Sequence, residues 1–97
     1  MLQEITINQF EPLLGQTMTL EYADGALAVE LVEVSALRSP SPRPQSPFSL
    51  TLRADTLAPL VEQGICRLQH PVLGALELFV VPTGPDGQGN TYQIIFN

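Results

Sequence analysis

Cys66 and His70 are the single thiol and the single imidazole of the chain, and together they could form a nucleophile and its base. Four residues apart in an extended strand, the two side chains fall on the same face. A Cys–His nucleophile also needs an orienting group and an oxyanion site, and the alternating pattern places Cys66 beside Leu68 in the core. We therefore predict that Cys66 is a buried thiol and that His70 caps the corner at Pro71 by hydrogen bonds to local backbone.

The other candidates for chemistry are a glycine-rich segment, residues 84–90, and the carboxylates of Glu21, Glu30 and Glu33. The segment lacks the Gly-Lys-Ser/Thr ending and the following helix of a phosphate loop, and a calcium loop needs more than one carboxylate. We expect a hairpin loop there, and a solvated outer face for the three glutamates, because no apolar pocket surrounds them. One thiol and one imidazole alone do not make a tetrahedral zinc site. The sequence thus predicts no catalytic residue, no metal and no cofactor, and a protein that is not an enzyme.

The elements that would position these residues follow a period of two along most of the chain. Alternating apolar and polar residues predict six strands, and turn residues such as Asp24 and Gly25 separate them. At Val32 the alternation shifts by one residue, which is the sequence trace of a β-bulge. The predicted strands are residues 17–22, 27–34, 48–53, 64–69, 75–81 and 91–96.

One segment, residues 6–15, has helical rather than strand spacing. Phe10, Leu13 and Leu14 share a face, Gly15 is a stop signal, and Pro12 limits the helix to a turn or two. With the six strands, this segment predicts a single all-β domain over residues 1–97. We expect an antiparallel meander that closes into a small six-stranded barrel or a barrel-like sandwich, with the short N-terminal helical turn plugging one end.

Composition and charge limit the classes of partner. The 97 residues are 44% hydrophobic and only 14% charged, against roughly 25% in an average domain, so the chain should fold around one core. Residues 38–47 are rich in proline and serine and form a predicted flexible loop. This loop carries Arg38 and Arg43, which leaves a charge of −8 on the rest of the chain. An acidic body argues against a nucleic-acid partner and against attraction to an anionic membrane.

The cellular compartment can be predicted from the N-terminal residues and from the length of the apolar stretches. No positively charged region followed by an apolar run opens the chain, as it would in a signal peptide. The longest apolar stretch, residues 78–81, is far shorter than the roughly 20 residues of a membrane span. A single cysteine agrees with a reducing compartment. We expect a cytoplasmic protein without a transmembrane segment.

Six short motifs of turn and core residues resemble a known protein family. They are Phe10-Glu11-Pro12-Leu13-Leu14-Gly15-Gln16-Thr17, Pro47-Phe48-Ser49-Leu50, Gln63-Gly64, His70-Pro71-x-Leu73-Gly74, Leu78-Phe79-Val80-Val81-Pro82 and Tyr92-x-x-x-Phe96-Asn97. Over nearly the whole chain they are similar to an uncharacterised bacterial family of roughly 90 to 100 residues, a domain of unknown function. Met18 departs from the pattern, because an aromatic residue is commoner there. The resemblance implies a structural or accessory role near phage-tail-collar-like proteins, and it supplies no catalytic residues.

An apolar cluster on the predicted outer face is the main candidate for a binding surface. If the alternate positions of the fifth and sixth strands face the core, Phe79, Val81 and Ile95 point outward from neighbouring strands. The alternative is that the N-terminal segment or the connection after the third strand covers them. We predict a non-enzymatic structural or protein-interaction module that binds a protein partner, or a second copy in a homodimer, through this face.

Two alternatives remain open at this point. The Pro/Ser-rich loop offers Pro40, Pro42, Arg43 and Pro44 to an aromatic groove, although a flexible loop without a partner is the simpler interpretation. The alternative function, from another class, is a small-ligand-binding or enzymatic barrel with a pocket near His70.

Overall fold

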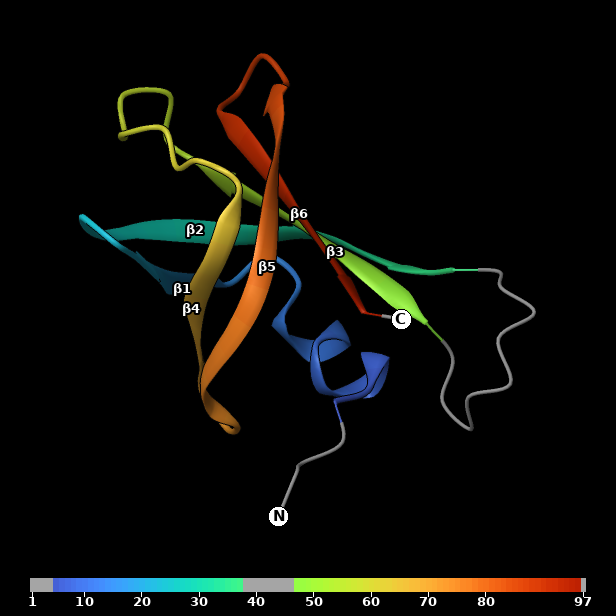
Figure 1. Ribbon diagram of the computed structural model, residues 1–97. Helices are drawn as coiled ribbons and strands as arrows, with labels where there is room; N and C mark the ends of the chain where they lie inside the picture. The colour runs from blue at the N-terminus through green and yellow to red at the C-terminus, as the bar shows by residue number, and fades with distance from the viewer. Residues whose placement is uncertain (1–4, 38–46, 97) are drawn as a thin grey trace.

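The computed structural model describes residues 5–37 and 47–96 and consists mainly of β-strands (Figure 1). All six predicted strands are present. Five are longer than predicted: β3, β4 and β6 by one residue each, β2 because it takes in the turn residue Gly25 and runs on to Ala36, and β5 because it continues past Pro82. The elements are η1 (Ile7–Gln9), η2 (Glu11–Leu13), β1 (Thr17–Tyr22), β2 (Gly25–Ala36), β3 (Phe48–Ala54), β4 (Gly64–His70), β5 (Gly74–Pro85) and β6 (Asn90–Phe96).

The strands form a closed antiparallel barrel in the order β1-β2-β3-β6-β5-β4, which confirms the predicted barrel and excludes the sandwich. The meander is split in two, and this corrects the expectation of one continuous meander. Strands β1 to β3 and β4 to β6 each pair in sequence, whereas β3 pairs with β6 and β1 pairs with β4. The cause is the connection of residues 55–63, which carries the chain past β6 and β5 in the strand order. The Val61 N–H holds this connection by donating to the Tyr92 hydroxyl at 3.0 Å.

Two register shifts allow so small a sheet to curl into a barrel. The first lies between Leu31 and Glu33 in β2, and it confirms the bulge predicted at Val32. The second lies between Pro82 and Gly84 in β5. Gly84 has a φ of +94°, a left-handed conformation that glycine adopts without steric strain. Because a bulge bends its strand and increases the local twist, both shifts favour closure.

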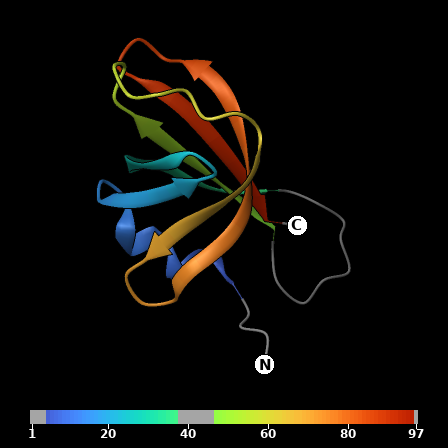
Figure 2. The same ribbon diagram turned by 60° about the vertical axis from the view of Figure 1, so that its left-hand side comes forward.

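The N-terminal turns plug one end of the barrel, as predicted, and they form two 3-10 turns. Figures 1 and 2 show them at the rim where β4 passes into β5. Phe10, between the two turns, is fully buried, and its ring centroid lies 5.9 Å from that of Phe48 and 5.6 Å from that of Phe96. Phe48 and Phe96 are register partners on β3 and β6, and their rings stack at 4.5 Å.

Alternate side chains of every strand fill the rest of the interior, which is how a small barrel buries its core. The sequence pattern predicted this alternation, and β1 and β4 follow it most closely, whereas β3 also buries Ser49 and β6 also buries Thr91. The other large side chains with almost no exposure are Leu20, Val29, Leu31, Leu50, Leu52, Leu68, Val80, Tyr92 and Ile94.

Of the predicted Pro/Ser-rich loop, only Pro47 belongs to the described residues, and it is buried. The candidates for recognition by an aromatic groove lie outside the described residues: Pro40, Pro42, Arg43 and Pro44. Their recognition stays a prediction.

Candidate functional site

His70 closes the corner between β4 and β5 by hydrogen bonds to backbone, as predicted. Its Nδ1 accepts from the N–H groups of Val72 and Leu73, both at 3.0 Å. Its Nε2 lies 2.9 Å from the carbonyl oxygen of Gln9 in η1. Because Nδ1 accepts, we assign the ring proton to Nε2, which donates to Gln9. The residue is 5% exposed, and its ring meets Phe10 edge-on with centroids 5.0 Å apart. His70 therefore fastens the plug to the barrel.

Cys66 is buried on the same strand but is not an activated nucleophile. Its Sγ lies 3.9 Å from the carbonyl oxygen of Gly64, and His70 is engaged elsewhere. Burial raises the pKa of the Cys66 thiol. The thiolate is the reactive form, so a raised pKa lowers reactivity at neutral pH. The structure thus agrees with the predicted core role for Cys66.

The outer face of β4, β5 and β6 carries a row of exposed apolar side chains, which we call the outer row: Ile65, Phe79 and Ile95. Ile65 and Phe79 are register partners. Ile95 lies on β6, and the β5–β6 ladder ends at Val81 and Gln93, two residues before Phe79 and Ile95. The exposed fraction is 65% for Ile65, 49% for Phe79 and 51% for Ile95. Two of the three predicted surface residues, Phe79 and Ile95, are therefore exposed, and Phe79 shares its patch with Ile65.

The surface predicted from sequence and the outer row differ at two residues, Val81 and Ile65. Val81 lies two residues along β5 from Phe79 and is only partly exposed, so it flanks the outer row. Ile65 does not belong to the surface predicted from sequence, although it alternates with the buried Cys66 along β4. The signal that could have found it is the turn at His70–Gly74, which fixes the β4–β5 register and with it the pairing of Ile65 and Phe79.

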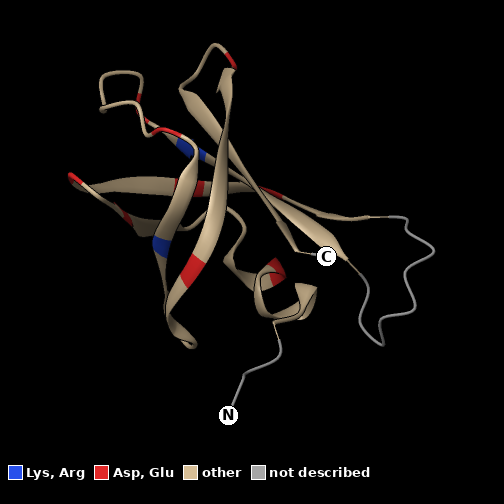
Figure 3. Ribbon diagram, in the orientation of Figure 1, with Lys and Arg blue, Asp and Glu red and all other residues tan. Residues whose placement is uncertain are grey.

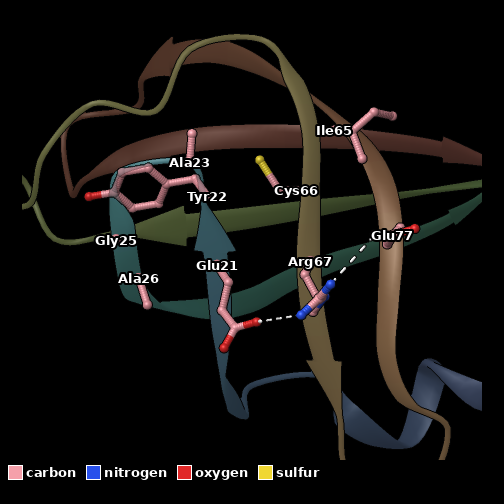
Figure 4. A pocket seen from close by; sticks show the side chains of 9 residues that line it. All are labelled: Glu21, Tyr22, Ala23, Gly25, Ala26, Ile65, Cys66, Arg67 and Glu77. Carbon is pink, nitrogen blue, oxygen red and sulfur yellow. Dashed lines mark ion pairs between the residues drawn. The ribbon is translucent and has the colours of Figure 1, made fainter.

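A cleft lies beside the outer row, where β1 and β4 separate. These strands pair only at Leu20 with Leu68 and at Glu21 with Arg67, whereas β3 and β6 pair along seven residues. Beyond Glu21 the two strands diverge, and a cleft of about 630 Å³ opens between β4 and the β1–β2 hairpin (Figure 4). A second cleft of about 380 Å³ shares part of this lining and reaches residues 60–64. We call the region the β1–β4 seam.

Charged side chains line the β1–β4 seam. The Arg67 guanidinium lies 3.8 Å from a carboxylate oxygen of Glu21 and 3.6 Å from one of Glu77 (Figure 4). Gln69 also donates to Glu21, at 3.1 Å. Asp24 and Glu62 line the second cleft. The side chains in the two ion pairs are largely exposed, so the pairs are weak and can rearrange.

The glycine-rich segment is a hairpin loop, as predicted. Asp86 Oδ1 accepts from the backbone N–H groups of Gln88 and Gly89 at 2.9 and 3.0 Å, and Oδ2 accepts from Arg53 Nε at 2.7 Å. The Arg53 hydrogen bond is the largest of the effects that lower the pKa of the Asp86 carboxyl. A Cβ atom on Gly89 would collide with the carbonyl oxygen of Ala54, so only glycine fits there. These contacts order the loop and leave no free carboxylate for a ligand.

The predicted outer-face glutamates hold surface positions. Glu30 is exposed, and Glu33 accepts a hydrogen bond from the Thr51 hydroxyl at 3.3 Å. Within residues 5–37 and 47–96, no three His, Cys, Asp or Glu side chains gather closely enough to hold a metal ion. No helix in the described part of the chain is long and apolar enough to cross a bilayer.

Comparison with known proteins identifies a family. No curated protein and no solved structure matches the chain. One family model does match, and it covers residues 5–96, from η1 through the end of β6. The turn and core motifs at Phe10–Gly15, His70–Gly74 and Leu78–Pro82 all lie within the matched range. The chain therefore belongs to the family described as Domain of unknown function (DUF6916).

Proposed function

We propose that this protein is a non-enzymatic interaction module that binds a partner protein through the outer row. One observation carries the proposal: Ile65 and Phe79 are register partners on the outer face, Ile95 is exposed on the next strand, and each of the three is about half exposed or more. Single exposed apolar residues are ordinary, but a contiguous cluster usually marks a contact surface. Phe79, at the centre of the row, is the kind of aromatic residue that anchors such contacts.

The charge around the outer row indicates the chemistry of the partner. Without Glu4, Arg38 and Arg43, which lie outside the described residues, the chain has nine acidic residues and two arginines. Figure 3 shows the acidic positions spread over the barrel, with blue only on β3 and β4. A partner with an apolar centre and a positively charged rim would complement this surface. A second copy would bring acid against acid, so we favour a different protein over a homodimer.

The biological context that we propose for this interaction is the one that the family resemblance predicted. An accessory role near a phage-tail-like assembly would supply a protein partner, and we keep it as part of the proposal. This context rests on the resemblance, whereas the binding surface rests on the residues of the outer row and their surroundings.

The alternative, a ligand-binding or enzymatic barrel with a pocket near His70, has less support. Both ring nitrogens of His70 bond to backbone, and Phe10 and the 3-10 turns occupy that end of the barrel. A ligand there would have to displace the plug. His70→Ala tests this alternative, which requires that a measured activity be lost while the fold persists.

Quantitative capture with matched variants tests the proposed interaction. Phe79→Asp places a charge at the centre of the outer row, and Thr19→Asp places the same charge on an exposed outer position of β1. We expect Phe79→Asp to lose, by at least tenfold, a partner that the wild type and Thr19→Asp retain, because a buried unpaired charge is costly at an interface. Both variants should fold, with a stability cost of about 1 kcal/mol or less.

Light scattering and salt titration complete the test. A monomer whose partner binding weakens as salt rises supports a basic partner. A dimer that Phe79→Asp converts to a monomer would show that the occupant is a second copy. Equal partner capture by the wild type and Phe79→Asp, at equal stability, would overturn the outer row as the binding surface.

A further inference from the structure

The β1–β4 seam leaves strand edges without a partner strand inside a closed barrel. Continued past Glu21 and Arg67, the β1–β4 register would set Tyr22 opposite Cys66 and Ala23 opposite Ile65. The strands diverge instead, and no backbone hydrogen bond between described residues joins these positions. The N–H and C=O groups on this side of β4 therefore face the cleft. A free strand edge is a template for pairing with another chain.

The cleft beside this edge has room for an extended peptide. Its volume of about 630 Å³ lies within the range of roughly 300–1,000 Å³ that is typical of ligand sites. The opposite wall is the β1–β2 hairpin, where Ala23, Gly25 and Ala26 have little or no side chain to obstruct a guest. At about 3.3 Å per residue, the free edge at 64–66 takes three residues of an added strand.

The lining predicts which side chains such a strand would carry. Alternate residues of a strand point to opposite faces of the sheet. On the inner side, the Cys66 side chain points into the gap between the strands (Figure 4), and an apolar residue would pack there. On the outer side, Glu21 and Glu77 flank the mouth, with Asp24 and Glu62 beyond. Arg67 is the one base among these lining residues, so the seam has a net negative charge that matches a basic guest.

We propose that the β1–β4 seam is a strand-addition site, in which an extended segment of a partner, alternating basic and apolar residues, pairs with the free edge of β4 at Gly64–Cys66. This inference rests on the proposed function, since it names how a partner segment is held beside the outer row. Main-chain hydrogen bonds supply the affinity, and the alternating side chains supply the specificity, as in other cases of strand addition.

Peptide titration followed by amide NMR tests the proposal. The probe is the capped pentapeptide Arg-Val-Arg-Val-Arg. One control is Glu-Val-Glu-Val-Glu, and another is the basic peptide with N-methyl groups on alternate backbone nitrogens. We expect the basic peptide to shift the amide signals of residues 22–25 and 64–66 and to slow hydrogen exchange at the free edge. Both control peptides should bind at least tenfold more weakly.

Two pairs of charge-neutralising changes sharpen the test on the protein side. Asp24→Asn with Glu62→Gln removes two carboxylates of the seam, and asparagine suits a turn position as aspartate does. We expect about a fivefold loss of affinity for the basic peptide, as two surface charges would give. The matched control, Glu11→Gln with Glu30→Gln, removes two exposed carboxylates away from the seam and should leave affinity within about twofold.

The other outcomes separate this inference from the proposed function. Equal binding of the N-methylated peptide would overturn strand addition, because main-chain pairing would then be unnecessary. Shifts confined to Ile65, Phe79 and Ile95, or no shifts, would overturn the seam as the site and leave the outer row to its own test. Seam binding that persists in Phe79→Asp, with no captured partner, would support the seam and count against the outer row.

Discussion

The plugged rim and the β1–β4 seam are two places where this barrel could have been open, and the chain treats them differently. At the rim, Phe10 fills the end of the core, and His70 uses both ring nitrogens to join η1, β4 and the following turn. At the seam, two residue pairs close the barrel, and a cleft opens directly beyond them. The rim thus has its polar groups paired inside the chain, whereas the seam presents strand edges and weak surface ion pairs to the outside.

The difference indicates which region contributes most to stability and why we propose binding at the other. A buried aromatic cluster with satisfied hydrogen bonds contributes to the global free energy of unfolding. A short ladder beside a cleft opens locally at lower cost, and binding elements are drawn from such low-stability regions. We therefore expect changes at the rim to alter folding, and changes at the seam to alter local opening and binding.

Phe10→Ala should have the largest effect. Truncation of a fully buried aromatic ring leaves a cavity among Phe48, Phe96 and His70, and such changes cost about 3–5 kcal/mol of unfolding free energy. Chemical denaturation measures the loss. The matched control is Leu14→Ala, at a half-exposed neighbour in the same segment, which should cost less than about 1 kcal/mol. Equal costs for the two variants would show that the plug does not belong to the core.

His70 variants should have an intermediate effect and show whether its hydrogen bonds or its bulk matter. His70→Ala strands the Val72 and Leu73 N–H groups and the Gln9 carbonyl, at a cost of about 2 kcal/mol. His70→Asn retains a short acceptor for the N–H two residues on, so it should recover part of the loss. The order wild type, His70→Asn, His70→Ala in denaturation midpoints supports the capping role. A His70→Asn variant no more stable than His70→Ala would contradict it.

Much of the barrel could be predicted from sequence because its signals are local. Alternation places side chains on one face of a strand or the other. The strands and the core residues therefore follow from the pattern of apolar and polar residues. The bulge at Val32 appears as a shift of phase, and the corner at His70 appears as an imidazole next to a proline. Each of these features depends on neighbours within a few residues.

The strand order and the proposed binding surfaces depend on residues far apart in the chain, and the alternation of residues along each strand does not contain that information. Nothing in β3 itself shows that it pairs with β6 rather than β4, because both partners alternate equally well. For the same reason, the sequence pattern does not show that Ile65 lies opposite Phe79, because that pairing requires the β4–β5 register. The seam is harder still, because no residue type marks the point at which β1 and β4 diverge.

Arg67→Gln should have the smallest effect on global stability and the most local one. It removes two exposed ion pairs, at 3.8 Å to Glu21 and 3.6 Å to Glu77, which together contribute about 0.5 kcal/mol or less. Because these pairs tie β4 to β1 and β5 at the last paired residues of the seam, amide exchange at 20–22 and 66–68 should quicken by about threefold. The amides of β3 and β6, paired along seven residues, are the internal control and should keep their rates. A uniform change across both ladders would mean that the seam opens only with the whole barrel, and the contrast between seam and rim would then disappear.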